Sequence, residues 1–207
     1  MSADLILYSN PMSRGRIARW MLEEVGQPYR VEMIEFGPPM KDPAYLAINP
    51  MGKVPALKHG GAVVTEAAAV CVYLAAAFPE AGLTPAAGTA AHADYLRWLF
   101  FAAGPLEAAV TAKSLNLLAP PERSRLAGYG RYEDVMDTLE LAVTGKTAIA
   151  GDRFSAADVY VGSQIGFGLA FKSIEPRPAF TAYWEGLASR PAQQRAAALD
   201  DAAMPTP

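Results

Sequence analysis

The chain has 207 residues, of which 52% are hydrophobic and 19% are charged, and its formal net charge is −3. A composition this apolar excludes an extensively disordered chain. The slight acidic excess disfavours a protein that binds nucleic acid through its phosphates. At about 150 residues per domain, the length predicts one large domain or two small ones.

Several other classes of protein are disfavoured by simple features of the sequence. The longest apolar run, Ala67–Phe78, is shorter than the ~20 residues of a membrane-spanning helix. No basic segment precedes the short apolar run near the N-terminus, so we expect no secretory signal and a cytoplasmic protein. The chain has a single cysteine, Cys71, and two histidines, His59 and His92, which disfavours an intramolecular disulfide, a CxxC redox pair and a structural metal site.

Strand and helix patterns alternate at the start of the chain. Leu5–Tyr8 is a short apolar run closed by Ser9-Asn10-Pro11, which is typical of a buried strand. From Arg14 the apolar residues follow helical spacing, and Gly26 is the expected C-cap. Tyr29–Glu35 then alternates with a period of two. This order predicts a βαβ unit with two parallel strands.

A hairpin and a helix complete the predicted first domain. Val54–Lys58 and Ala62–Val64 flank His59-Gly60-Gly61, whose paired glycines suit a tight turn. Thr65 is the expected N-cap of a helix over Ala67–Phe78. That helix is apolar on nearly every side, so we expect it to be buried.

A change of composition marks the predicted domain boundary. We expect an α/β domain over residues 1–79, a linker over 80–88, and an all-α domain over 89–207. The predicted helices of the second domain are Ala90–Ser114, Pro121–Val143, Ser155–Phe171 and Pro178–Ser189. Gly104-Pro105 predicts a bend or break in the first of them. The chain ends in Pro205-Thr206-Pro207, where we expect fraying.

Two motifs stand out. Ser155–Asp158 reads S-x-x-D, the spacing of a helix capping box, and neither histidine is near enough in sequence to make it a catalytic pair. Asn49–Leu57 reads N-P-M-G-K-V-P-A-L, which by itself predicts a tight turn before a strand. With a serine at the first strand-to-helix turn, Thr65-Glu66 at a helix start and S-x-x-D in an all-α half, the whole chain resembles the cytosolic glutathione transferases.

The resemblance implies a thioredoxin-like N-terminal domain, a helical C-terminal domain, glutathione as co-substrate and no metal. It also implies a cis bond before Pro55 and backbone pairing between Val54 and the cysteinyl part of glutathione. Glu66 would lie near the γ-glutamyl end. Lys53 is a candidate ligand of a glutathione carboxylate, and Lys41 is a lesser candidate for the glycyl carboxylate.

One position departs from the family pattern. Where the family carries a hydroxyl residue after the acidic residue, this chain has Ala67. Backbone N–H groups at a helix start still bind a carboxylate, but one hydrogen-bond donor is lost. This departure motivates an alternative function, a noncatalytic binding or assembly module with the same fold.

The family's chemistry requires a group that stabilises the glutathione thiolate. Ser9 and Ser13 stand just before the first predicted helix, with Tyr8 at the end of the strand. We assign the catalytic role to Ser13, because Ser9 should still belong to the strand exit. Arg14 and Arg16 are secondary candidates that would add positive potential. The loop contains no cysteine, which disfavours a mixed disulfide with glutathione.

The implied activity is conjugation of glutathione to small hydrophobic electrophiles, with glutathione-dependent reduction of hydroperoxides as a side activity. We expect the electrophile pocket between the two domains, with apolar and aromatic walls. Its candidate residues are Met12, Trp98, Phe101, Leu106, Phe167 and Phe171.

The resemblance also implies a homodimer, in which the helix near Glu66 and the helix from Ala90 pack across a two-fold axis. Small side chains would permit close approach, with Asp94 and Arg97 at a polar rim. The alanines concerned are Ala67, Ala68, Ala69, Ala75, Ala76 and Ala77.

Overall fold

A computed structural model describes residues 5–204 of the chain. Its residues divide into two compact units. Of the described residues, the first contains 5–83 and 190–204, and the second contains Thr84–Ser189. Within the described range, no helix is long and apolar enough to cross a membrane.

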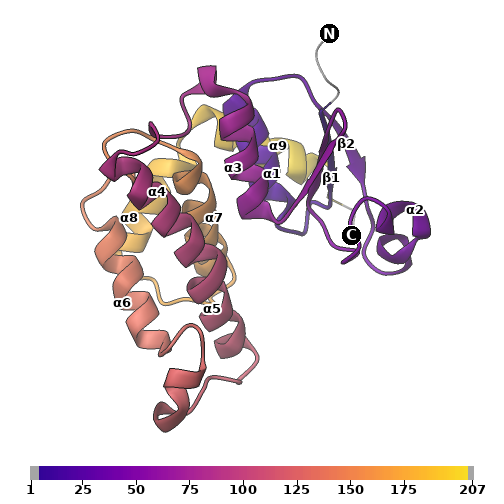
Figure 1. Cartoon of the computed structure of the whole chain (residues 1–207). Helices are drawn as coiled ribbons and strands as arrows, with labels where there is room; N and C mark the ends of the chain where they lie inside the picture. Colours follow the sequence, from indigo (N-terminus) through magenta and orange to yellow (C-terminus); the bar gives the residue numbers. More distant parts are fainter. Residues whose placement is uncertain (1–4, 205–207) are drawn as a thin grey trace. The chain divides into compact units, whose positions relative to one another are not determined.

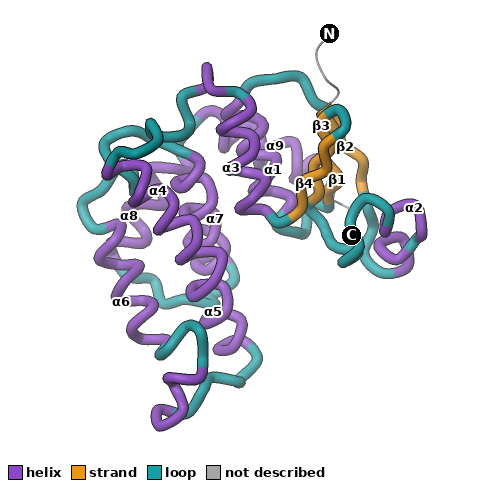
Figure 2. The backbone as a smooth tube through the Cα atoms, viewed as in Figure 1, coloured by secondary structure: helices purple, strands orange, loops and turns teal. Residues whose placement is uncertain are grey.

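The first unit is built on a four-stranded sheet with the order β2-β1-β3-β4 (Figure 2). Its strands are β1 (Leu5–Ser9), β2 (Arg30–Met33), β3 (Ala56–His59) and β4 (Ala62–Thr65). β1 is parallel to β2 and antiparallel to β3, and β3 is antiparallel to β4. The predicted βαβ unit and hairpin are therefore confirmed.

Two helices cover one face of this sheet (Figure 1). α1 (Gly15–Val25) contacts β1 and ends at Gly26, whose φ of 74° explains the glycine. α3 (Ala67–Ala77) contacts α1, β3 and β4. The predicted N-cap of α3 is wrong, because Thr65 is the last residue of β4 and Glu66 lies between strand and helix. Short helices at Pro38–Lys41, α2 (Pro43–Leu46) and Pro79–Ala81 complete the connections.

The second unit is helical. Its helices are α4 (Ala90–Phe101), a π-helix (Ala102–Leu106), α5 (Glu107–Ser114), a 3-10 helix (Pro121–Leu126), α6 (Tyr132–Val143), α7 (Ala156–Ala170) and α8 (Pro178–Ala188). The predicted irregularity at Gly104-Pro105 is confirmed, and it takes the form of a π-helix because Pro105 has no N–H to donate.

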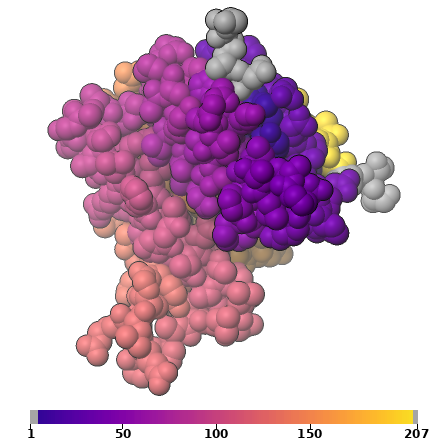
Figure 3. All heavy atoms as spheres, turned by 45° about the vertical axis from the view of Figure 1, so that its right-hand side comes forward, coloured from indigo at the N-terminus to yellow at the C-terminus, as the bar shows by residue number. Residues whose placement is uncertain are grey.

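The predicted helix from Pro121 to Val143 is wrong in its first half. The 3-10 helix ends at Leu126, and α6 begins only at Tyr132. Gly130 between them has a φ of 71°, which a helix cannot continue through. Figure 3 shows this segment, in salmon, standing out from the helices of its unit, and the Leu126 side chain is 85% exposed there.

The C-terminal helix α9 (Pro191–Ala202) differs most from expectation. The sequence predicted one helical domain over residues 89–207, yet α9 returns to the first unit and packs against α1 (Figure 1). Its alanine-rich face fits closely, and Ala192 and Ala196 are buried. The expected fraying of Pro205–Pro207 lies outside the described residues.

The predicted capping box at the start of α7 is confirmed. Its acidic residue also bonds to groups outside this helix. The buried Asp158 carboxylate accepts hydrogen bonds from Ser155 N (2.8 Å), Ile149 N (2.7 Å) and the Tyr183 hydroxyl (2.6 Å). Burial raises the pKa of Asp158, and these donors act in the opposite direction. One carboxylate therefore joins α7, the loop before it and α8.

Replacing Asp158 with Asn should lower the free energy of unfolding by about 3 kcal/mol, because a buried set of donors loses its charged acceptor. Urea unfolding of the purified protein measures this loss. Asp152→Asn, which changes an exposed acid six residues earlier, is the matched control and should leave the midpoint unchanged. Equal midpoints for the two variants would contradict the prediction.

Candidate functional site

Strand register brings the predicted site segments to one edge of the sheet. Tyr8 of β1 pairs with Ala56 of β3, and Ala56 pairs with Thr65 of β4. The turn after β1, the Val54-Pro55 bond before β3 and Glu66 after β4 therefore emerge side by side. Val54-Pro55 is cis, as expected. The fold thus assembles residues that lie far apart in the sequence.

The turn between β1 and α1 is held by a hydrogen-bond network around Ser13. Its hydroxyl donates to the Asn10 carbonyl (2.7 Å) and accepts from the Gly15 N–H (2.9 Å). The Asn10 side chain accepts from Met12 N (2.9 Å) and donates to the Ile34 carbonyl (3.0 Å). Ser13 therefore links the turn to Gly15, the first residue of α1, and its side chain is half-buried, within reach of solvent.

Ser9 occupies a different environment. Its side chain is fully buried, and among the described residues its hydroxyl has no hydrogen-bond partner. A Cβ added to Gly15 would lie 2.0 Å from the Ser9 hydroxyl oxygen and 3.0 Å from that of Ser13. Both hydroxyls thus converge on the start of α1, but Ser13 is the more accessible of the two.

The N-P-M-G-K segment is fixed through its backbone. The Lys53 carbonyl accepts from the Tyr45 hydroxyl (2.6 Å) and from the Asn49 amide (2.7 Å). Burial raises the pKa of Tyr45 to about 12, which keeps its hydroxyl protonated and able to donate. Lys41 donates to the Met51 carbonyl (2.9 Å), so its ammonium group ties the same loop. The Lys53 side chain is exposed.

The start of α3 is open to an anion. Glu66 is exposed and has a φ of 67°, a conformation that costs a non-glycine residue free energy and is frequent at functional sites. No side chain caps this helix start, and uncapped first-turn N–H groups attract carboxylates. Ala67 is buried, so its backbone rather than its side chain is available there.

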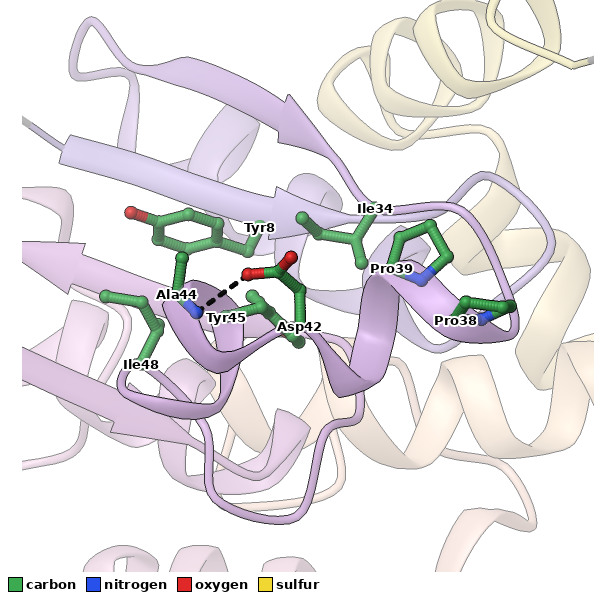
Figure 4. Close-up of a pocket in the computed structure, with 8 residues that line it drawn as sticks. All are labelled: Tyr8, Ile34, Pro38, Pro39, Asp42, Ala44, Tyr45 and Ile48. Carbon is green, nitrogen blue, oxygen red and sulfur yellow. Dashed lines mark hydrogen bonds between the residues drawn. The ribbon is translucent and has the colours of Figure 1, made fainter.

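A pocket of about 670 Å³ lies between the sheet and the α2 segment (Figure 4). The rings of Tyr8 and Tyr45 stand 5.9 Å apart beside it. Its lining residues are Tyr8, Ile34, Pro38, Pro39, Asp42, Ala44, Tyr45 and Ile48. The sequence analysis missed this pocket, because the irregular stretch before α2 carries no periodicity that would place it. Ser13, Val54 and Glu66 are not among the lining residues.

The predicted electrophile-pocket residues separate into two groups. Trp98 and Leu106 are 7% and 2% exposed, so little of either side chain is open to a ligand. Phe101 packs edge-on against Trp98, with 5.6 Å between ring centroids, but it is partly exposed and stays a candidate. Helical spacing alone could not distinguish core from pocket.

The remaining candidates are more accessible. Phe167 and Phe171 lie 6.4 Å apart in the second unit, and Phe171 is 79% exposed. Met12 belongs to the first unit and is 54% exposed.

The single cysteine and the acidic and histidine side chains complete the description of the candidate groups. Cys71 is fully buried in α3, and burial raises the pKa of its thiol far above the ordinary value. Over residues 5–204, no group of three or more His, Cys, Asp or Glu side chains could hold a metal ion.

Gly15→Ala should destabilise the protein by about 1–3 kcal/mol, because the new methyl group would overlap the Ser9 hydroxyl. Thermal or urea unfolding measures the loss. Gly186→Ala, at a position of α8 where an added Cβ meets no atom within 4 Å, is the control and should be neutral or stabilising. Adding Ser9→Ala to Gly15→Ala should restore part of the loss, and no recovery would contradict the stated cause.

Comparison with known proteins agrees with this geometry. A family model described as "Glutathione S-transferase, N-terminal domain" matches residues 12–77. Glutathione S-transferase 1 of Zea mays is 30% identical over 190 residues, covering 86% of this chain and 88% of that protein. A glutathione transferase structure from Methylococcus capsulatus has a TM-score of 0.77 at 28% identity, covering 96% of this chain and 99% of the other.

A sphingomonad glutathione S-transferase solved in complex with glutathione has a TM-score of 0.75 at 27% identity, and the match covers 95% of this chain and 98% of the other. The predicted fold, a thioredoxin-like domain with a helical domain, is confirmed. The chain resembles these proteins along its whole length, and its sheet brings Ser13, Val54-Pro55 and Glu66 together. We conclude that this chain belongs to the glutathione S-transferase family.

Proposed function

We propose that Ser13 stabilises the glutathione thiolate in this glutathione transferase. The observation that carries the proposal is the convergence of the Ser13 turn, the cis Val54-Pro55 bond and Glu66 at one sheet edge. Ser13 stands at the positive end of α1 and within reach of solvent, whereas Ser9 is buried. Ser13 is therefore the better placed hydroxyl to meet a bound sulfur.

Before it can donate to sulfur, the Ser13 hydroxyl has to turn away from the Asn10 carbonyl, to which it donates at 2.7 Å. A neutral hydrogen bond contributes only about 1 kcal/mol net, whereas one to an anion contributes about 1.5–3 kcal/mol. The exchange is therefore favourable when a thiolate is present. Ser13 keeps its own proton, and the thiol proton leaves to solvent.

The Ser13 hydroxyl and the start of α1 together can supply the free energy needed to stabilise the thiolate. Lowering the thiol pKa by two units takes about 2.7 kcal/mol. One charge-assisted hydrogen bond and the positive end of a helix, at about 0.3–1 kcal/mol, together supply an amount of this order. The thiolate then attacks an electrophilic carbon, and the leaving group departs with the bonding electron pair.

Glutathione itself would extend along the same edge. Its cysteinyl backbone would pair with Val54, and its γ-glutamyl carboxylate would sit at the uncapped start of α3, beside Glu66 and Ala67. Lys53 is exposed and free to approach a carboxylate. Lys41 is the weaker candidate, because it already donates to the Met51 carbonyl.

The second substrate is a small hydrophobic electrophile, with hydroperoxide reduction as a side activity and the cytoplasm as the compartment. Met12, Phe101, Phe167 and Phe171 remain the candidates for contact with it. Family membership favours this enzyme over the noncatalytic module.

Ser13→Ala should lower kcat/KM by about 10-fold or more and raise the pKa of bound glutathione, since the thiolate loses a charge-assisted hydrogen bond. Steady-state rates with chlorodinitrobenzene and a hydroperoxide, together with the ultraviolet absorbance of the thiolate as a function of pH, measure both effects. Ser9→Ala is the matched control and should retain activity. An unchanged kcat/KM in Ser13→Ala would refute the assignment.

We further propose a homodimer formed through α3 and α4. On α4, Leu96 and Phe100 are exposed, the latter to 73%, and their spacing of four residues places them on one face of the helix. Of the small residues proposed on α3, Ala69 and Ala76 are exposed. Ala67 and Ala75 are buried within their own unit and are no longer candidates.

Sedimentation equilibrium should therefore give a mass of about twice 22.0 kDa at micromolar concentration. Phe100→Glu should shift the protein toward the monomer, because it places a charge in the apolar centre of the contact. Leu126→Glu, at an exposed leucine remote in sequence from both helices, should leave the mass unchanged. A wild-type mass near 22.0 kDa would overturn the proposal.

A further inference from the structure

α1 and α9 lie side by side and present opposite charges to each other (Figure 1). Four ion pairs join α1 to α9 and to Arg190, the residue just before α9, within the first unit. They are Arg16 with Asp201 (2.6 Å), Arg19 with Asp200 (2.8 Å), Glu23 with Arg195 (3.0 Å) and Glu24 with Arg190 (2.7 Å). The arginines of each helix thus face the acids of the other along the whole contact.

This charge pattern is unfavourable for each helix alone. A helix prefers acidic residues in its first turn and basic residues in its last turn. α1 instead has Arg16 in its first turn and Glu23 and Glu24 in its last, and α9 ends with Asp200 and Asp201. The positions of these charges therefore do not stabilise each helix by itself. They are explained by the ion pairs between the two helices.

The ion pair of Arg16 with Asp201 also contacts the turn that carries Ser13. The Arg16 guanidinium donates from Nε to the Pro11 carbonyl (2.6 Å) and from Nη2 to Asp201 (2.6 Å). Pro11 belongs to the turn that carries Ser13. One guanidinium thus connects the last turn of α9 to the backbone beside the proposed catalytic hydroxyl.

The neighbouring pair fixes α9 in place. The Arg19 and Asp200 side chains are 6% and 1% exposed, so this ion pair is buried. Breaking a buried pair is costly, whereas an exposed pair such as Arg16 with Asp201, whose side chains are 26% and 67% exposed, contributes little to stability. Asp201 can therefore orient Arg16 without being needed for folding.

We infer that Asp201 is a positioning residue, which holds Arg16 against the Pro11 carbonyl and so keeps the Ser13 turn in its active conformation. The inference rests on the proposed role of Ser13 and extends it to the C-terminal helix. The end of the chain thereby takes part in activating glutathione through backbone geometry, without touching the substrate.

The direction in which Asp201→Ala shifts the pKa of the glutathione thiol distinguishes a positioning role from a direct effect of charge. Removing the Asp201 carboxylate leaves the Arg16 charge uncompensated, which by itself would lower the pKa of a nearby thiol. Releasing the Ser13 turn would raise that pKa, because the thiolate loses its hydrogen bond. Positioning therefore predicts a higher thiol pKa in Asp201→Ala.

Amide hydrogen exchange tests the link without reference to catalysis. Asp201→Ala should accelerate amide exchange in residues 12–16, where N–H groups donate to oxygens of Asn10 and Ser13 in the turn. Arg195→Ala breaks an ion pair at the other end of the same helix contact and is the matched control, expected to leave these amides unchanged. Equal exchange in both variants would overturn the inference, whatever the activity.

Kinetics then tests the consequence. Asp201→Ala should lower kcat/KM about threefold to fivefold, the effect expected of one exposed ion pair, with a raised thiol pKa. Asp201→Glu should restore both, and Arg195→Ala should change neither. A lowered or unchanged thiol pKa in Asp201→Ala would refute the positioning role. If the wild type formed no glutathione thiolate, the proposed function would fail instead, and the exchange data would still decide the structural link.

Discussion

β3 lies between β1 and β4 in the sheet and is antiparallel to both. Because antiparallel neighbours begin where their partners end, the exit of β1, the entry to β3 and the exit of β4 must meet at one edge of the sheet. Ser13, Val54 and Glu66, the main groups proposed to hold glutathione, come from these three connections. A shift of register would separate them and would also turn the buried face of the sheet to solvent.

The site combines fixed backbone with adjustable side chains. The Lys53 carbonyl is held by two donors, and the Ser13 turn is closed by the Asn10 side chain and carbonyl. In the proposed mechanism, the Ser13 hydroxyl turns from the Asn10 carbonyl to the glutathione sulfur. A pre-arranged backbone with one rotatable donor suits the stabilisation of a charge that appears only when the thiol ionises.

The C-terminal helix α9 belongs to the first unit, although the second unit precedes it in the sequence. After passing through the second unit, the chain returns to place α9 on α1, where Arg19 and Asp200 form a buried ion pair. Within the second unit, Asp158 plays a comparable role by joining α7 to the preceding loop and to α8. A buried carboxylate thus joins helices in each unit, Asp158 through several donors and Asp200 through the Arg19 guanidinium.

The sequence by itself determined the local structure and the family. The family resemblance, which the N-P-M-G-K-V-P segment helps to carry, implied the cis bond before Pro55. Apolar periodicity placed the strands and most helices, and Gly26 and the S-x-x-D motif marked helix ends. These features depend on neighbours a few residues apart, so a linear pattern is enough to predict them. Ser13 could be chosen over Ser9 by position alone, although its hydrogen bonds could not be foreseen.

Only the tertiary structure decided the features that depend on distant segments. The ion pairs of α9 join residues more than 160 positions apart, as in Arg190 with Glu24, and nothing in the alanine-rich C-terminal sequence predicts such a partner. In the same way, Trp98 and Phe171 share helical spacing and apolar character, yet one is buried and the other is exposed. Burial depends on what packs against a residue, and that is a property of the folded chain.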